Sequence, residues 1–428
     1  MKRVILLEMN EVSLPFLERY VAQGRLPAFQ AMLEKHGYIV TESESVYEHL
    51  EPWIQWVTLH SGLTFGEHGI YRLGDAVHSE VRQVFEVLEE KGLRVGAISP
   101  INAANRLHNA AFFVPDPWTA GAVSGPGNLR RLYEAISQAV NDNARSRISF
   151  RSLLWFVGGF LRYARPSNLY TYFQYVLGAR RRPWARALFL DCLLSDVFIK
   201  LWLATKPDFA SLFLNGAAHI QHHYFFNSSA YSGNQRNPEW YVEHGDDPVL
   251  EAYELYDSIL GSIQRAAPDA RILVATGLSQ EPCESPVYYY RLRDHDAFLK
   301  RIGIEYNRVL ARMSRDFLIE CRDAAQAKKA EQVLRSGTLG NVPLFEVDNR
   351  GDSLFAMLSY PHRIDAHARA SFSTREVHDF GREVAFVAMK NGRHNGAGYL
   401  IDTGAPGTGR ERVPLASVFH RLVNACTA

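Results

Sequence analysis

The sequence predicts an α/β fold in which a mostly parallel central sheet is flanked by helices, with a helical insertion and a small α+β addition. Three observations predict it. Short apolar runs alternate with helical stretches, as in successive strand and helix units. The runs are continuously apolar, which is typical of parallel strands buried on both faces. The composition, with 428 residues, 47% hydrophobic, 22% charged and a net charge of +1, is that of a globular protein and excludes intrinsic disorder.

The elements of the predicted core follow in chain order. Residues 4–7 are expected to form the first strand, and Ser13 and Pro15 to begin a helical region that continues over 26–33. Further strands are expected at 95–98, 211–214, 272–275 and 384–389, and further helices at 81–90, 248–265 and 414–424. The strand at 384–389 is expected to return to the main sheet.

Two segments depart from this alternation. Residues 128–207 have a helical pattern throughout and are expected to form an inserted cap. Residues 304–361 are expected to form the α+β addition, with strands at 313–320, 344–347 and 354–358 around a helix at 323–334. The core is then expected to comprise 1–127, 208–303 and 362–428.

Cysteine usage and hydropathy bear on the compartment. The four cysteines are far apart and form no CxxC pair, so neither a disulfide framework nor a zinc knuckle is indicated. The apolar run at 4–7 is too short for a signal sequence, and the longest apolar stretch, 153–161, is well short of the ~20 residues of a membrane span. We therefore expect a cytoplasmic protein that is not integral to a membrane.

Polar side chains follow the predicted strands of the core. They are Glu8 and Asn10 after the first strand, His219, Gln221, His222 and His223 after the strand near 214, Gln280 after the strand near 274, and Arg393 and His394 after the strand near 387. Ligands of open α/β sheets bind outside the carboxyl ends of the strands, so these residues are the candidate site. Histidines three or four apart can place two imidazoles on one helix face as metal ligands. The alternative is a hydrogen-bonded, partly buried cluster.

A second candidate segment runs over residues 48–56. Glu51 and Pro52 suit the start of a helix, where unpaired N–H groups and the helix dipole favour an anion such as phosphate. His49, Trp53 and Gln55 lie beside them and are candidate substrate contacts. The alternative is simple capping, with the tryptophans in the core.

Several phrases occur in a characteristic order along the chain. Residues 24–27 read Gly-Arg-Leu-Pro and 35–37 read Lys-His-Gly; Ser61-Gly62 is followed by His68-Gly69-Ile70, and later by His222, by 277–279 and by His394 before a glycine. This order resembles the alkaline phosphatase superfamily, in particular its branch of type I phosphodiesterases and nucleotide pyrophosphatases, over most of the chain. An alkaline phosphatase-like fold is what the resemblance implies.

The resemblance also implies a site with two metal ions, usually zinc, which activate a Ser or Thr nucleophile and hold the transferring phosphoryl group. It makes His222 and His394 two ligands of one metal ion. Five of the seven expected positions are replaced, by Asn10, Ala218, Gly277, Leu278 and, beside Glu51, Pro52. Polar groups nevertheless remain in the neighbourhood, at Glu8, Glu11, Glu51, His219, His223 and Gln280.

We therefore expect a rebuilt site. Either it holds one divalent metal ion, zinc being favoured, through His222 and His394 with His219 and His223 as further candidate ligands, or it uses no metal. Without metal, Glu51 or Glu8 would act as acid or base. With metal, Asn10 and Gln280 would orient substrate or water, and Glu51 would be the candidate base or nucleophile. Gln221 and Arg393 are added to His49, Trp53 and Gln55 as candidate substrate contacts.

Residues 145–190 form a basic and aromatic segment with nine arginines, eleven aromatic residues and no Asp or Glu. Such a segment can receive an anionic or lipid-linked substrate or contact a phospholipid surface. The alternative is a cap whose aromatic residues form its own core. Nucleic acid is not expected as a partner, because no binding motif accompanies the segment and the whole chain is neutral.

These observations predict a hydrolase or phosphoryl-type transferase that acts on a phosphodiester or phosphomonoester. The basic segment suggests that the substrate is linked to a glycan, a lipid or a nucleotide. Two alternatives belong to other classes of protein. One is a protein that binds a phosphorylated ligand without turning it over. The other is a scaffold that docks on a membrane or a partner. Resemblance of fold does not choose among them.

Overall fold

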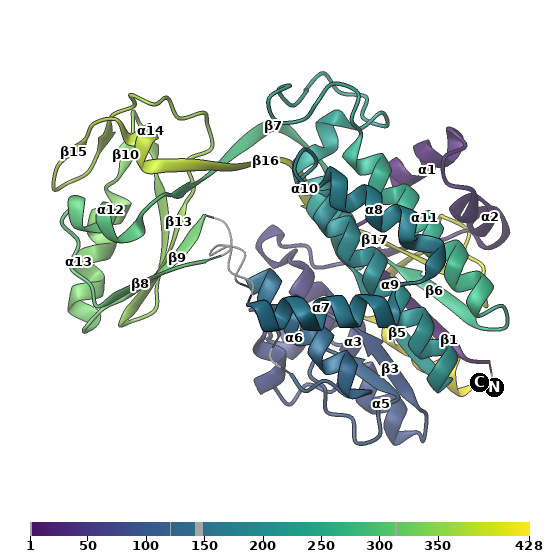
Figure 1. Ribbon diagram of the computed structural model, residues 1–428. Helices are drawn as coiled ribbons and strands as arrows, with labels where there is room; N and C mark the ends of the chain where they lie inside the picture. Colours follow the sequence, from purple (N-terminus) through teal and green to yellow (C-terminus); the bar gives the residue numbers. More distant parts are fainter. Residues whose placement is uncertain (1, 120, 142–148, 313–314) are drawn as a thin grey trace. The chain divides into compact units, whose positions relative to one another are not determined.

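The computed structural model describes residues 2–119, 121–141, 149–312 and 315–428, and these form two compact units. The first unit lies within Met1–Val140, Ile148–Pro282 and Gly392–Ala428, and the second is built on Cys283–Asn391. The chain leaves the first unit within strand β7 (Ser279–Leu292) and returns within β16 (Val384–Asn395), and these two strands pair with each other. Figure 1 shows both units, with elements labelled where there is room.

The first unit contains an eight-stranded sheet that is mostly parallel, as the sequence predicts. The strand order is β18-β2-β17-β6-β1-β5-β3-β4. The strands are β1 (Val4–Met9), β2 (Ile39–Glu42), β3 (Val95–Ile98), β4 (Phe112–Val114), β5 (Phe209–Leu214), β6 (Arg271–Ala275), β17 (Ala397–Asp402) and β18 (Arg412–Pro414). Strand β1 is buried along its whole length between parallel neighbours β5 and β6, and β17 alone runs antiparallel to its neighbours.

Helices cover both faces of this sheet because successive side chains of β1 point to opposite sides. Ile5, Leu7 and Met9 pack with α1 (Leu14–Ala22), α2 (Pro27–His36), α9 (Ala185–Thr205), α10 (Gly216–Tyr224) and α11 (Pro248–Ala266). Val4 and Leu6 pack with α3 (Pro52–Ser61), α5 (Val84–Glu90) and α15 (Ser417–Thr427). The polar strand ends therefore emerge between two apolar layers.

The predicted cap at 128–207 is helical in its described part, but it is continuous with the main core. It contains α6 (Gly127–Asn141), α7 (Phe150–Tyr163), α8 (Leu169–Gly178) and α9; residues 142–148 lie outside the described chain. Buried residues of all four helices belong to the same apolar cluster as β1 and β5. Helix α9 packs on β5 and α11, so the segment contributes a helix to the flank of the sheet.

The second unit is wider than the predicted addition at 304–361. It holds a sheet of order β12-β13-β9-β8, comprising β8 (Arg308–Ala311), β9 (Asp316–Glu320), β12 (Phe345–Asn349) and β13 (Ser353–Leu358), and a smaller sheet of β10 (Thr338–Leu339), β11 (Val342–Pro343), β14 (Ala370–Ser371) and β15 (Glu376–Val377). Its helices are α12 (His295–Arg301), α13 (Ala324–Arg335) and α14 (Phe380–Glu383). Residues 313 and 314 of the predicted strand 313–320 lie outside the described residues.

The boundaries differ because the second unit has its own apolar core. Tyr290 and Phe298 precede the predicted segment, Phe372 and Phe380 follow it, and all four pack into that core. Val384 packs there too, which is why the strand predicted at 384–389 pairs with β7 and does not return to the main sheet. The late strand that does join the main sheet is β17, which follows β16 in the chain.

Candidate functional site

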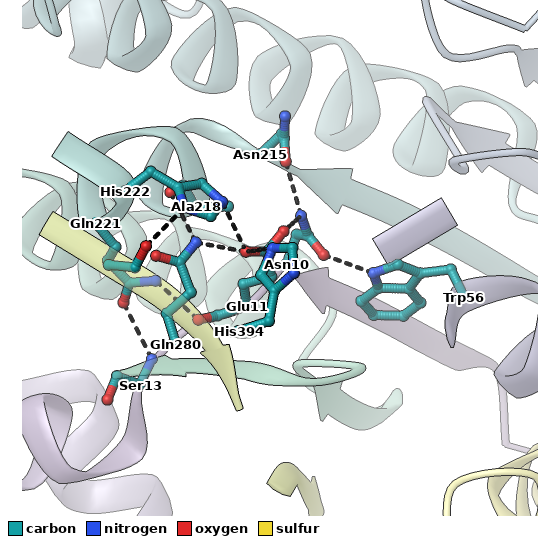
Figure 2. A network of polar contacts seen from close by, with 11 residues as sticks. Asn10, Glu11, Ser13, Trp56, Asn215, Ala218, Gln221, His222, Gln280 and His394 are labelled. Atoms are coloured by element: carbon teal, nitrogen blue, oxygen red, sulfur yellow. Dashed lines mark hydrogen bonds and ion pairs between the residues drawn. The ribbon is translucent and has the colours of Figure 1, made fainter. Parts of the chain in front are cut away.

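The candidate site begins where β1 ends, at Asn10 and Glu11. The backbone N–H of Asn10 donates to the Leu214 carbonyl at 3.1 Å, and that of Glu11 donates to the Thr276 carbonyl at 3.0 Å. The end of β1 is thus pinned between the ends of β5 and β6. Glu11 adopts the left-handed region with φ 58°, which is uncommon for a residue other than glycine. This turn places the Glu11 carboxylate among side chains from three other segments (Figure 2).

The Glu11 carboxylate is the centre of a cluster with His222 and His394. Its Oε2 lies 3.3 Å from His222 Nε2 and 3.2 Å from His394 Nε2. The ligand atoms of these three residues all lie within 4.8 Å of one another. Gln280 Nε2 also donates to Oε2, and Asn10 Nδ2 donates to Oε1 at 2.9 Å. In Figure 2 these side chains converge on one carboxylate.

The electrostatics of the cluster keep Glu11 ionised. The residue is only 2% exposed, and burial by itself raises the pKa of its carboxyl. The charges of His394 and His222, together with hydrogen bonds from both rings, nevertheless hold that pKa well below its usual range. The site therefore presents a buried anion beside two imidazoles.

The His222 ring is oriented by the start of the C-terminal segment. Its Nδ1 lies 3.4 Å from the Gly392 carbonyl oxygen, so a proton on Nδ1 is positioned to donate there, while Nε2 faces Glu11. Position 392 requires glycine: an added Cβ would lie 2.5 Å from Gln280 Oε1 and 2.8 Å from the Gln221 carbonyl. Gln280 is held in turn because its Nε2 also donates to the Ala218 carbonyl at 3.0 Å.

Helix α10, which carries His222, is fixed at its start by a buried carboxylate of α9. Asp191 Oδ2 accepts the Gly216 N–H at 2.7 Å and the Tyr256 hydroxyl at 2.7 Å. Burial raises the pKa of Asp191 to about 6, although both hydrogen bonds favour the charged form. Gly216 is close-packed here, since an added Cβ would lie 2.6 Å from Asp191 Oδ2.

The Asn10 side chain is committed to neighbouring residues. Trp56 Nε1 donates to Asn10 Oδ1 at 2.7 Å, and Asn10 Nδ2 donates to Asn215 Oδ1 at 2.8 Å as well as to Glu11. Because an indole N–H can only donate, it fixes which end of the amide faces Glu11. The Trp56 ring also packs on Gly277, where φ is +72° and an added Cβ would lie 2.9 Å from the indole.

Gln221 and Glu8 are fully buried, and neither belongs to the group formed by Glu11, His222 and His394. Gln221 Oε1 accepts the Tyr253 hydroxyl at 2.5 Å and the Ser13 N–H at 3.1 Å, while its Nε2 donates to the Glu11 carbonyl at 2.8 Å. It braces the turn at Glu11. Glu8 follows Val4 and Leu6 on the other face of β1, where its Oε2 lies 3.2 Å from Nε2 of fully buried His60.

The four histidines predicted as ligands divide into two pairs. His222 and His394 meet at Glu11, with ring centroids 5.1 Å apart. His219 and His223 contact each other, with ring centroids also 5.1 Å apart, and His219 is exposed. Positions 219 and 223 are four apart and lie one above the other on α10, whereas 222 and 223 are about 100° apart around the helix axis. The His222 ring therefore reaches Glu11, while the ring of His223 contacts His219.

The remaining predicted site residues are held as follows. Glu51 precedes α3, and its carbonyl accepts the N–H groups of Ile54 and Gln55. Gln55 Nε2 donates to the His49 carbonyl at 2.8 Å, and Trp53 Nε1 donates to the Tyr71 carbonyl at 3.1 Å. Arg393 is exposed and pairs with Glu281 at 2.8 Å.

Glu11 was grouped with other polar residues by sequence but was not expected as a ligand. The resemblance implies a ligand at position 10, and the sequence does not predict the left-handed turn that brings Glu11 there instead. The sequence feature that points to Glu11 is a carboxylate directly after Asn10 at the end of a strand. Two imidazoles and one carboxylate are a donor set found at catalytic zinc sites with three protein ligands, so these residues fit a divalent metal ion.

Comparisons with known proteins give structural neighbours only. No protein-family model matches the chain, and no curated protein matches it. The chain is similar to phosphonoacetate hydrolase from Sinorhizobium meliloti 1021 in complex with phosphonoacetate, with 13% identity, 100% of this chain and 96% of that chain covered, and a TM-score of 0.48.

Two further similar structures are murine ectonucleotide pyrophosphatase/phosphodiesterase 5 and the alkaline phosphatase from the Antarctic bacterium TAB5. The first has 10% identity, coverage of 100% of this chain and 95% of that chain, and a TM-score of 0.44. The second has 10% identity, coverage of 99% and 98%, and a TM-score of 0.41.

Proposed function

We propose that the protein is a phosphate-ester hydrolase or phosphoryl-type transferase that works with one divalent metal ion, zinc being favoured. The observation that carries the proposal is the convergence of Glu11, His222 and His394 at the carboxyl edge of the sheet. In the described part of the chain, this is the one group of three or more His, Cys, Asp or Glu residues whose ligand atoms come together in this way.

The residues around the metal site have distinct proposed roles. A divalent ion bound there would supply Lewis-acid chemistry to a phosphoryl oxygen. The ionised Glu11 offers charge to the ion, and His222 is aligned by its contact with the Gly392 carbonyl. Gln280 and Asn10 act as positioning residues, because both donate to the Glu11 carboxylate.

A single metal ion is favoured over two by the surroundings of Asn10. Its amide oxygen already accepts the indole N–H of Trp56. Because an indole can only donate, the amide cannot turn round without losing this hydrogen bond. Gly277 and Leu278 offer no side-chain ligand, and the Trp56 ring packs on Gly277. The positions that the resemblance would give to a second ion thus offer no carboxylate or imidazole ligand.

Charge on the substrate is proposed to be met at the start of α3. Pro52 has no N–H and the N–H groups of Ile54 and Gln55 donate to the Glu51 carbonyl, so it is the positive end of the helix dipole that favours an anionic group here. Glu51, at the same helix start, is the proposed acid or base. The substrate is proposed to be a phosphodiester or phosphomonoester attached to a glycan, lipid or nucleotide.

Metal content tests the proposal. The untagged protein should contain one equivalent of zinc or another transition metal by elemental analysis, and His222→Ala, His394→Ala and Glu11→Gln should each lose it. His219→Ala is the matched control, because the exposed His219 is outside the group formed by Glu11, His222 and His394, and its replacement should leave the content unchanged. Absence of metal from the wild-type protein, or retention in all three variants, would contradict the proposed site.

Turnover separates an enzyme from a binding protein. The metal-loaded protein should hydrolyse p-nitrophenyl phosphate or bis-p-nitrophenyl phosphate, and Glu11→Gln should remove that activity together with the metal. The alternative function, binding of a phosphorylated ligand without turnover, is favoured by the commitment of Asn10 to Trp56 and by the burial of Glu8. It predicts metal-dependent binding of such a ligand and no product.

A cytoplasmic location is part of the proposal. Among the described residues, no helix combines the length and apolarity needed to cross a bilayer. Cys192, Cys321 and Cys426 are buried thiols outside any disulfide. Unpaired cysteines are typical of proteins in a reducing compartment.

A further inference from the structure

Helices α7 and α8 carry an exposed apolar surface, which we call the α7–α8 face. On α7 it is represented by Phe150, Leu154 and Leu161, which are 75%, 55% and 75% exposed. On α8 it is represented by Tyr170, Phe173 and Leu177, which are 71%, 58% and 65% exposed. The spacings of three, four and seven residues place each set on one side of its helix. Exposed apolar residues gathered on one side of a helix are typical of an interaction site.

The inner sides of the same two helices are already packed. Phe156 and Phe160 of α7 lie against Phe189 of α9, with ring centroids 6.0 Å and 5.9 Å apart, and Tyr172 of α8 lies 5.0 Å from the same ring. Phe160 and Tyr172 also contact each other, with centroids 4.9 Å apart. Both helices are thus anchored on one side of α9, and the α7–α8 face is their outer surface.

The charge around this face is of one sign. From residue 149 to residue 190 the sequence contains no Asp or Glu. Within the described chain, exposed Arg151, Arg162, Arg180 and Arg186 form no ion pair with a carboxylate, and Arg151 lies over the Trp155 ring at 4.3 Å. The neighbouring arginines differ, since Arg165, Arg181 and Arg182 pair with carboxylates of α9, of the loop before α11 and of α11, respectively.

We propose that the α7–α8 face binds the surface of a membrane that contains anionic phospholipids. Apolar side chains on one side of a helix and arginines beside them are the two features with which interfacial helices bind acyl chains and headgroup phosphates. A second copy of the chain is a poorer occupant, because a two-fold interface would place the same cationic surface against itself. The inference is independent of the metal site and of turnover.

Vesicle sedimentation with the full-length protein tests this. The wild-type protein should sediment with vesicles of phosphatidylcholine and phosphatidylglycerol and remain in the supernatant with phosphatidylcholine alone. Phe150→Glu and Leu161→Glu should abolish sedimentation, with circular dichroism showing that the exposed substitutions leave the fold intact. Arg162→Ala and Arg180→Ala should each lower the affinity for the anionic vesicles about fivefold, and added salt should weaken it further.

The matched control is Trp240→Glu, which changes a side chain that is 60% exposed and lies outside both helices, and which should sediment as the wild type does. Two results would overturn the proposal. One is a wild-type protein that ignores anionic vesicles. The other is a concentration-dependent dimer, seen by sedimentation velocity, that Leu161→Glu dissociates while vesicle binding is absent or unchanged.

Discussion

At the scale of single residues, the site depends on side chains that hold Glu11 as much as on Glu11 itself. Trp56 illustrates this, because its indole N–H fixes the amide of Asn10, which in turn donates to the carboxylate. Neither residue offers a donor to a substrate in this arrangement. Their contribution is to set the direction and the hydrogen bonding of an ionised group.

Trp56→Phe is therefore expected to destabilise the protein and weaken metal binding. The change keeps an aromatic ring but leaves the Asn10 amide oxygen, which is 1% exposed, without its donor. A buried acceptor left unpaired costs about 1–3 kcal/mol, to be measured by urea unfolding alongside a metal titration. Trp53→Phe removes the same kind of N–H donor from a partly exposed residue and is the control. Equal effects of the two changes would refute a special role for Trp56.

At the scale of elements, the ends of β16 and α10 position the two imidazoles. Gly392 lets the segment bearing His394 approach Gln280 closely, and Asp191 holds the start of the helix that bears His222. Each contact joins residues far apart in the sequence. Both can be tested without altering a proposed ligand.

Gly392→Ala is expected to disturb the site through its backbone. The added methyl would overlap Gln280 Oε1 and the Gln221 carbonyl, so the strand end carrying His394 has to shift. Overpacking of this kind costs roughly 1–3 kcal/mol, and the metal content should fall with it. Gly396→Ala is the comparison, because the nearest atom to its added Cβ is 3.4 Å away. Metal bound normally by Gly392→Ala would show that the close approach is dispensable.

Asp191 should make the free energy of unfolding depend on acidity. Its pKa is raised to about 6 in the folded protein from an ordinary value of 3.8. As the pH rises between these values, the unfolded chain releases a proton that the folded protein retains, so stability falls by roughly 3 kcal/mol across the window and is then constant.

Asp191→Asn should flatten this part of the profile, measured by urea unfolding at a series of pH values from about 4 to about 7. The exposed carboxyl of Asp269 provides the control, since Asp269→Asn should leave the profile as it is in the wild type. A profile that keeps its fall in the Asp191→Asn variant would assign the dependence to another group.

At the scale of the whole molecule, each of the two units is stabilised by its own apolar core. The metal site belongs to the first unit, whereas Phe298 is fully buried in the core of the second. Such a chain need not unfold in one step. We expect two transitions in calorimetry, with added metal raising only one of them.

Phe298→Ala should lower the other transition, because truncating a buried phenylalanine costs about 3–5 kcal/mol. Metal content should stay at the wild-type value, since none of the proposed ligands packs in that core. A single transition shifted equally by metal and by Phe298→Ala would show that the two units unfold together.

The sequence predicts the central strands because β1, β3, β5 and β6 are continuous apolar runs. It does not predict β4 or β18, which have three residues each, too few to show a pattern. The site was predicted in part for similar reasons. The order of the predicted strands along the chain places His222 and His394 after strand ends. The face of β1 on which Glu8 lies and the left-handed turn at Glu11 depend on backbone geometry that one sequence does not specify.

The packing of Trp56 on Gly277 also constrains the evolution of this fold. An aspartate at position 277 would collide with the indole and would have to accept a left-handed backbone, so it is selected against while Trp56 is present. Losing Trp56 first would leave Asn10 without its donor. Each substitution is expected to be harmful in the background of the other residue, so single substitutions at either position are disfavoured. The two positions are expected to be epistatically coupled.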